Sequence, residues 1–248
     1  MAPRLWRADF LEGATIGARD GDIGRVVESY FDDQSWTVRY LVVDTGTWLP
    51  GRQVLISPCS VIDVEVSGQR LVADLSREQV KNSPGIDTAR PVSRQHEALL
   101  LEYYGLPFYW MGPYRWGPST VPAVPTGPTA VQEPSNAEMH LRSTRAVRGF
   151  GIHATDGDLG HVVDFLIEED AWAIRYLIVD PRSWWPGPHV LLATDWVTEV
   201  GWSDARVHVS VSRQAVRNAP TYDRRGAIER EYETRLHEHY GRRGYWIL

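Results

Sequence analysis

Glu229, Glu233 and His237 follow one another at four-residue spacing near the end of the chain, with His239 close by. On a helix this spacing places the three side chains on one face, where two carboxylates and an imidazole could hold a metal ion. A charged helix face exposed to solvent has the same spacing when arginines are interleaved. Because Arg225, Arg230 and Arg235 are interleaved here, we expect the solvated face and predict no metal site.

Two other features could suggest a metal or a reactive thiol. Asp20-Gly21-Asp22 alternates acidic residues as a calcium loop does, but the loop is short and lacks the glycine and distal glutamate of an EF-hand at the required spacing. A hairpin turn is expected there. Cys59 is the only cysteine, which excludes an internal disulfide and any Cys-built zinc or iron–sulfur site. We expect it to fill space as a small apolar residue.

No arrangement typical of an enzyme is present in the sequence. Neither a nucleophile elbow nor a glycine-rich phosphate loop occurs, so hydrolase and kinase chemistry have no support and no cofactor is predicted. Arg39 and Arg175 lie inside apolar stretches and could bind an anion. We expect them instead to point outward or to pair with a nearby carboxylate such as Asp44 or Asp180.

The composition is that of a folded protein with a mildly acidic surface. The chain has 248 residues, 43% of them hydrophobic, and its 26 Lys and Arg against 32 Asp and Glu give a net charge of −6. An acidic balance does not favour non-specific binding to nucleic acid or to anionic lipid. No uncharged apolar run reaches the length of a membrane span, and no signal peptide is recognisable, so a cytoplasmic location is predicted.

The sequence is a tandem repeat. A shift of 136 positions places Asp20-Gly21-Asp22-Ile23-Gly24 on Asp156-Gly157-Asp158-Leu159-Gly160 without a gap. Roughly 37 of the 95 positions from Ile16 to Trp110 are identical to their shifted partners. We therefore predict two copies of one module: a first repeat at 1–110, a Pro-rich linker at 111–145 and a second repeat at 146–248. The linker either runs freely in solvent or lies along a barrel, anchored by Tyr114 and Trp116.

Within a repeat, short segments rich in Val, Ile, Tyr and Trp alternate with turn residues, which predicts antiparallel strands. In the first copy these strands are Ile23 to Phe31, Trp36 to Asp44, Arg52 to Ile56, Val61 to Val66 and Arg70 to Ala73. A short capped helix is expected after Ser76, and longer helices over Val92 to Tyr104 and Ile228 to His239. The predicted fold class is mostly β with short helices, in two small antiparallel barrels.

Large aromatic residues are abundant, with 11 Trp and 11 Tyr, and several fall in expected loops and tails. Such residues either pack the two barrels on each other or anchor an interface with another protein. The candidate interface residues are Trp48, Trp110, Trp116, Trp184, Trp185, Tyr245 and Trp246.

Four motifs occur in the same order in both copies. They are the Asp-Gly-Asp-x-Gly turn, the Arg-Tyr-Leu-x-Val-Asp strand, the loop Trp48-Leu49-Pro50-Gly51 with Trp184-Trp185-Pro186-Gly187, and the Ser-Arg-x-x-Val-x-Asn-x-Pro segment. This ordered set resembles the PRC-barrel family, whose name derives from the cytoplasmic domain of the photosynthetic reaction centre H subunit. The resemblance implies small barrels that bind other proteins without catalysis. In the second copy, Arg242, Arg243 and Gly244 stand where the first has Leu106, Pro107 and Phe108.

This resemblance implies a non-catalytic binding or scaffold protein of bacteria. Its most concrete form is an accessory cytoplasmic subunit, peripheral on the inner membrane, that docks on a membrane complex such as a photosynthetic reaction centre. One alternative is a free-standing stress-related protein that self-associates as a homo-oligomer. A ribosome-maturation-type RNA factor is the other, and the net charge of −6 does not favour direct nucleic-acid binding.

Overall fold

The computed structural model describes residues 3–85, 92–124, 140–181, 187–224 and 226–247. The chain forms two compact units. The N-terminal unit consists of Ala8–Arg145 and Asp170–Ala173, and the C-terminal unit consists of Met1–Arg7, Ala146–Glu169 and Ile174–Leu248. Each unit therefore includes a segment that belongs, by sequence, to the other half of the chain.

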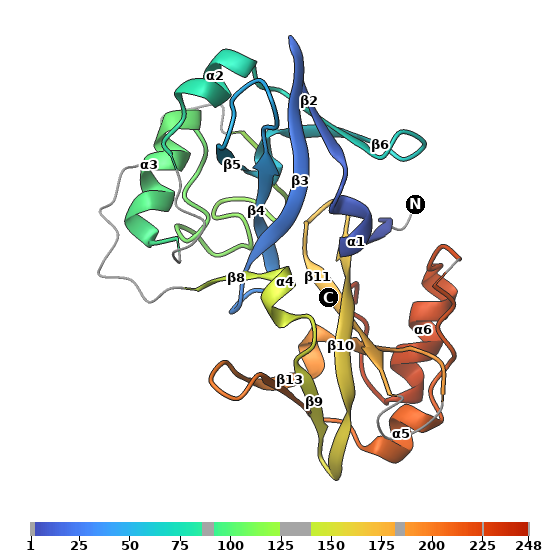
Figure 1. The fold of residues 1–248 in the computed structure, drawn as a ribbon. Coiled ribbons are helices and arrows are strands. Elements are labelled where there is room, and N and C mark those ends of the chain that lie inside the picture. The colour runs from blue at the N-terminus through green and yellow to red at the C-terminus, as the bar shows by residue number, and fades with distance from the viewer. Residues whose placement is uncertain (1–2, 86–91, 125–139, 182–186, 225, 248) are drawn as a thin grey trace. The chain divides into compact units, whose positions relative to one another are not determined.

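The N-terminal unit is built on one sheet. Its strands are β2 Thr15–Ala18, β3 Gly21–Asp32, β4 Thr37–Asp44, β5 Gln53–Ile56, β6 Val61–Glu65, β7 Arg70–Ala73 and β8 Leu141–Ser143. Their order is β5-β4-β3-β2-β7-β6, and β8 pairs with the end of β3 (Figure 1). All neighbours are antiparallel except β2 and β7.

The C-terminal unit repeats this topology. Its strands are β1 Leu5–Arg7, β9 Gly151–Ala154, β10 Gly157–Glu168, β11 Ile174–Asp180, β12 Val190–Ala193, β13 Val197–Gly201 and β14 Arg206–Val209. Their order is β12-β11-β10-β9-β14-β13, and β1 pairs with the end of β10. Much of each sheet is buried: every residue of β12 is buried, as are all but the last of β4.

Short helices follow each sheet. In the N-terminal unit α1 spans Ala8–Leu11, α2 Arg77–Asn82 and α3 Arg94–Tyr104, and in the C-terminal unit α5 spans Arg213–Arg217 and α6 Arg230–His239. Helix α4, Thr144–Val147, includes residues of both units. The predicted cap of α2 is confirmed, because the Ser76 side chain accepts from the Gln79 N–H and the Gln79 side chain accepts from the Ser76 N–H. Gly105 ends α3 with a φ of 64°, which a glycine adopts without strain.

The mostly β character with short helices is confirmed, and the strands expected between Ile23 and Ala73 form within one or two residues of their predicted ends. The predictions missed β2 and its counterpart β9, each of four residues. Strand pairing among the described residues gives an open strand order in both units. Closure of each sheet into a barrel thus remains a prediction.

Strands β1 and β8 are equivalent by the 136-residue shift, and each pairs with the sheet of the opposite repeat. Leu5, Trp6 and Arg7 lie opposite Glu168, Ile167 and Leu166. Leu141, Arg142 and Ser143 lie opposite Asp32, Phe31 and Tyr30, which are the shifted positions. The two halves of the sequence thus exchange their first strands in the same register.

Candidate functional site

The seven aromatic residues predicted as an interface fall in different environments. Trp116 is buried, with 2% of its surface exposed, and its Nε1 donates to the Ala171 carbonyl at 2.9 Å. Trp48, Trp110, Tyr245 and Trp246 are partly exposed, and Trp184 and Trp185 lie outside the described residues. Trp116 offers almost no surface to a partner, so the interface role stays a prediction for the others.

The start of the predicted linker is anchored to the N-terminal unit. Trp116 is one of the two anchors that we expected, whereas Tyr114 is 54% exposed. Between them, Arg115 donates to the Thr37 hydroxyl at 3.0 Å and to the Ser35 carbonyl. Residues 111–124 therefore include a segment that packs along the unit, and 125–139 lie outside the described residues.

Arg39 is at the centre of a buried cluster in the N-terminal unit. Its guanidinium lies over the Tyr109 ring at 3.8 Å and the Trp116 ring at 4.8 Å, and it donates to the Arg115 carbonyl at 2.7 Å. The carboxylate of Asp32 is 3.8 Å away. Burial lowers the pKa of Arg39, although the surrounding tyrosines and carboxylates oppose that shift.

Helix α3 contributes the carboxylate of this cluster. Glu97 is 3% exposed, accepts a hydrogen bond from the Tyr109 hydroxyl at 2.6 Å and lies 3.5 Å from Arg94. Desolvation outweighs these partners and raises the pKa of Glu97 to about 7. Arg94 also lies over the Trp110 ring at 4.4 Å. The aromatic tail is therefore attached to both the sheet and the helix.

The C-terminal unit contains the same cluster at shifted positions. Arg175 lies over the Tyr245 ring at 4.0 Å, and its Nε donates to Glu168 at 2.7 Å. The Tyr245 hydroxyl donates to Glu233 at 2.9 Å, and Arg230 lies over the Trp246 ring at 4.1 Å. Tyr245 and Trp246 thus act as anchors within their own unit.

The solvated helix face expected around Glu233 and His237 is wrong for these two residues, which are 1% and 2% exposed. Tyr176 reaches both of them, with its hydroxyl 2.9 Å from Glu233 and 3.0 Å from His237. Burial raises the pKa of Glu233 and lowers the pKa of His237. They face inward because the tail and the sheet cover that side of α6. Among the described residues, no group of three or more His, Cys, Asp or Glu side chains could hold a metal ion.

The sequence predicted correctly that the strand arginines lie beside carboxylates, but it named the wrong carboxylates. Arg39 and Arg175 each lie beside a carboxylate, but the carboxylates are Asp32 and Glu168. Asp44 and Asp180 lie elsewhere: Asp44 accepts from the Gly46 N–H, and Asp180 lies 3.8 Å from His189. The strand preceding each arginine supplies the charge because its end pairs with that arginine's strand.

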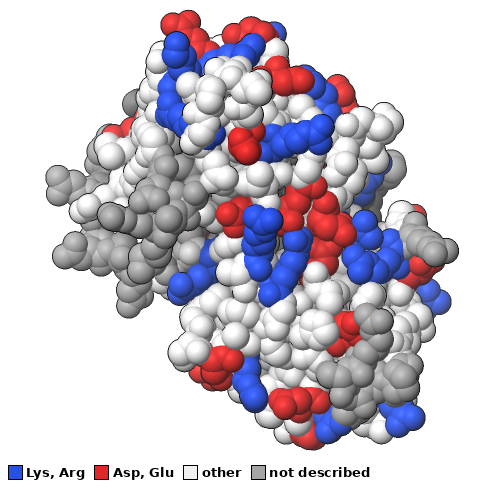
Figure 2. Space-filling view, viewed as in Figure 1, with Lys and Arg blue, Asp and Glu red and all other residues white. Residues whose placement is uncertain are grey.

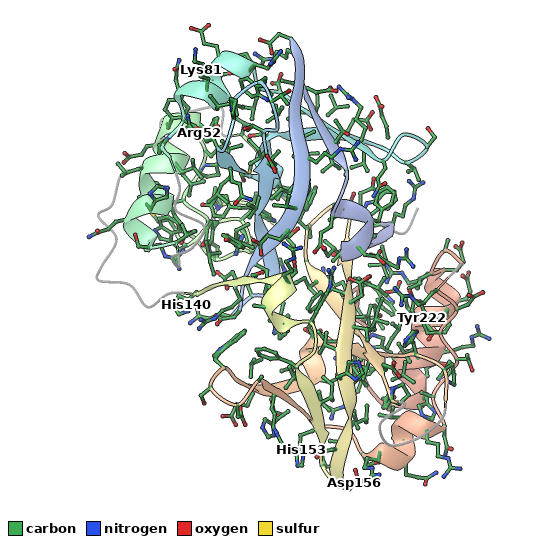
Figure 3. All side chains as sticks on the ribbon, viewed as in Figure 1. Arg52, Lys81, His140, His153, Asp156 and Tyr222 are labelled. Atoms are coloured by element: carbon green, nitrogen blue, oxygen red, sulfur yellow. The ribbon has the colours of Figure 1, made fainter. Side chains whose placement is uncertain are left out.

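A surface hollow of about 400 Å³ lies beside Trp48 in the N-terminal unit. The Trp48 Nε1 donates to the Ile23 carbonyl, and the Arg77 guanidinium lies over the ring at 4.4 Å. Arg52 fixes the adjoining helix end by donating to the Lys81 carbonyl, and Figure 3 shows these two residues on neighbouring segments. The hollow is lined by Asp20, Trp48, Arg77, Glu78, Lys81 and Asn82.

Asp20 has a structural role at this hollow. Its carboxylate accepts from the Arg77 N–H at 2.8 Å, as Asp156 accepts from the Arg213 N–H at 2.7 Å in the other unit. Both aspartates therefore connect the β-hairpin turn to the first residue of a helix. The plain turn expected in place of a calcium loop agrees with this geometry.

Comparison with known proteins gives no relative. The chain matches no protein-family model, and no curated protein matches its sequence.

Helix α3 presents an apolar surface next to the hollow. Leu99 is 57% exposed and Tyr103 is 40% exposed, one turn apart on the same face. The Tyr103 hydroxyl donates to the Gln79 carbonyl, which joins this face to α2. The equivalent positions on α6 are Arg235 and His239. In the N-terminal unit, exposed apolar residues of α3 therefore lie near an aromatic hollow.

Sequence reasoning missed Arg94 and Glu97, which complete the N-terminal cluster, and assigned their counterparts Arg230 and Glu233 to a solvated helix face. A signal for them was present, because both pairs are identical between the repeats at three-residue spacing. Charged residues retained in both copies of a module whose surface otherwise diverges indicate a shared internal contact.

Proposed function

We propose that this chain is a non-catalytic scaffold made of two PRC-type barrels, which binds another protein through the N-terminal unit. The repeated module, the β-rich units and the ordered motifs support the fold part of this proposal. Its concrete form is an accessory subunit on the cytoplasmic side of a membrane complex, of which a photosynthetic reaction centre is the example implied by the family resemblance.

The observation that carries the proposal is the surface formed by α2, α3 and the Trp48 loop, which we call the α2–α3 face. It joins the hollow beside Trp48 to the exposed side chains of Leu99 and Tyr103 through the contact between Tyr103 and Gln79. Aromatic residues at the edge of a hollow, next to exposed apolar side chains, are typical of protein interfaces. The polar rim of the α2–α3 face would consist of the charged side chains of Arg77, Glu78 and Lys81.

The charge pattern favours a protein partner over RNA. In Figure 2 acidic and basic side chains are interspersed on the face shown, and the chain carries a net charge of −6. RNA-binding surfaces require a continuous basic stripe to neutralise phosphates. None of the helices in the described part of the chain has the length and apolar character needed to cross a bilayer. Membrane association would therefore be through the partner in this proposal.

Co-purification from detergent-solubilised membranes tests the proposal. A tagged full-length chain, expressed in cells that make the candidate complexes, is expected to be recovered with a defined set of membrane subunits. Leu99→Glu places a charge on the α2–α3 face and should reduce this recovery at least several-fold. If the wild-type chain is recovered entirely without membrane subunits, the proposal is wrong.

The matched control is Ile62→Glu. Ile62 is 66% exposed, comparable to Leu99, and lies on the β6–β7 hairpin at the opposite side of the same unit from α2 and α3 (Figure 1). The Ile62→Glu variant introduces the same charge and should leave the recovery of membrane subunits unchanged. Equal loss with both variants would indicate a non-specific effect of charge and would count against the α2–α3 face.

A further inference from the structure

The end of β10 is an acceptor for a single added strand. On one edge β10 pairs with β11, whereas on the other edge β9 pairs only with Gly157 to His161. Strand β1 occupies the remaining part of that second edge, opposite residues 166–168. A sheet edge left open at this point would expose unpaired N–H and C=O groups, which bind extended chain readily.

The end of β3 also accepts one added strand. Strand β2 pairs with residues 21–25 on one edge, and β8 fills the later part of that edge, opposite residues 30–32. The added strands are held by more than backbone bonds, because Trp6 and Leu141 are 7% and 8% exposed. In addition, the Thr144 hydroxyl donates to the Ser29 carbonyl at 3.2 Å beside β8.

Donor and acceptor always come from opposite halves of the sequence, and the two registers are identical under the 136-residue shift. Both strand pairings could therefore be made equally by the corresponding half of another molecule. Only the tether between the halves, which gives the internal partner a high effective concentration, favours exchange within one chain.

We propose that this chain binds a second copy of itself by reciprocal strand exchange, with β8 of one copy on the β3 edge of the other and β1 on the β10 edge. This inference goes beyond the proposed function, since it uses the sheet edges and leaves the α2–α3 face free. The exchanged dimer forms when two chains fold together at high concentration, where intermolecular pairing competes with the tether.

Cysteine pairing between two tagged full-length chains tests the exchange. Both chains carry Cys59→Ser; one carries Ser143→Cys on β8, and the other carries Tyr30→Cys on β3. These positions face each other in the ladder, at a spacing that a disulfide can bridge. The chains are unfolded together, refolded at high concentration and oxidised. We expect a disulfide-linked dimer of the two tagged chains, at several times the yield of a control pair.

The control pair replaces Tyr30→Cys with Ser67→Cys, at an exposed position in the β6–β7 hairpin. Dimer yields equal to those of this control would overturn the proposal. A single chain with both Ser143→Cys and Tyr30→Cys gives the second measurement, and should oxidise internally to a monomer when refolded at low concentration. If this chain does not oxidise internally, the register itself is wrong and the proposal fails with it.

Discussion

The two buried clusters are built from equivalent residues but hold their strand arginines differently. In the C-terminal unit Glu168 reaches Arg175 directly, with its carboxylate 2.7 Å from Nε. In the N-terminal unit the shorter Asp32 stays 3.8 Å from Arg39, which turns instead to the Arg115 carbonyl and the Trp116 ring. One additional methylene thus decides whether the charge is satisfied by the sheet or by the segment that follows the tail.

Asp32 also closes the hairpin turn, which explains why a shorter carboxylate side chain is found at this position. Its Oδ1 accepts from the N–H groups of Gln34 and Ser35, at 3.0 and 2.9 Å, and so closes the hairpin turn. A glutamate would place its carboxylate too far out for this turn. The second difference is on the helices, where Leu101 in one cluster corresponds to His237 in the other. Between them, these differences predict unequal responses to mutation and opposite responses to pH.

Removal of the strand arginines should have the largest effect. Arg39→Ala leaves the buried Asp32 carboxylate without its cation and removes the guanidinium that packs on the Tyr109 ring, so we expect a loss of about 3–5 kcal/mol in the free energy of unfolding. Arg175→Ala should cost less, because that side chain is 14% exposed compared with 3% for Arg39. Urea unfolding measures the loss of unfolding free energy in both variants. Arg19→Ala, which removes an exposed ion pair, is the control and should change the free energy of unfolding by close to zero. Equal losses for the two buried arginines would remove the distinction between the clusters.

Glu97 should make the N-terminal cluster more stable in mild acid. Its pKa in the folded protein is raised to about 7, above the ordinary value of 4.5, so the folded state favours the protonated carboxyl. This stabilisation is complete below about pH 4.5 and is lost as the pH rises through 7, a difference of up to about 3 kcal/mol. Glu97→Gln should abolish this dependence, and unfolding curves at several pH values compare the two. An unchanged pH profile in the variant would contradict the assignment.

His237 should add the opposite response in the C-terminal cluster, where the raised pKa of Glu233 acts in the same direction as that of Glu97. The pKa of His237 is lowered by burial, so the folded state favours the neutral ring, whose Nδ1 lies 2.9 Å from the Arg243 carbonyl and whose Nε2 lies 3.0 Å from the Tyr176 hydroxyl. The stabilisation is present above the ordinary pKa of about 6.5 and is lost as the pH falls through the lowered value. His237→Leu, which copies Leu101, should cost about 1–3 kcal/mol at pH 8. That cost should shrink toward pH 5, and a cost independent of pH would show that packing alone is responsible.

The smallest effect is expected from exchanging the carboxylate lengths. Asp32→Glu gains the direct contact with Arg39 but loses the turn bonds to Gln34 and Ser35, for a net loss of about 1 kcal/mol. Glu168→Asp should lose the direct contact without gaining a turn. Thermal unfolding of the two variants and of the wild-type chain measures the comparison. A stabilising Asp32→Glu would show that the turn bonds are not the reason for the shorter residue.

Much of the fold could be predicted from the sequence, because strand segments such as Thr37–Asp44 combine β-branched residues with clear turns on both sides. The four-residue β2, with its two small residues Gly17 and Ala18, has too little pattern to recognise. The exchange of β1 and β8 could not be predicted from the sequence either. Three-residue strands show no periodicity, and pairing between distant segments leaves no local signal.

The candidate site was predicted less well than the fold. Trp116 was a candidate interface residue because it lies in the expected linker, yet it is 2% exposed. Charged residues at helical spacing, such as Glu233 and His237, normally face solvent, and only the covering tail turns that face inward. By contrast, the partly exposed Trp48 lies beside a surface hollow, a placement close to the one that its loop suggested.

Hydroxyl-radical footprinting with mass spectrometry tests most directly whether the tails are internal anchors and the α2–α3 face is free. It reports the solvent accessibility of individual side chains in the intact chain. We expect Tyr109 and Trp116 to be protected in the folded protein, while Leu99 and Tyr103 react at rates close to those in the unfolded chain. Strong modification of Tyr109 and Trp116 together with protection of Leu99 would contradict the account.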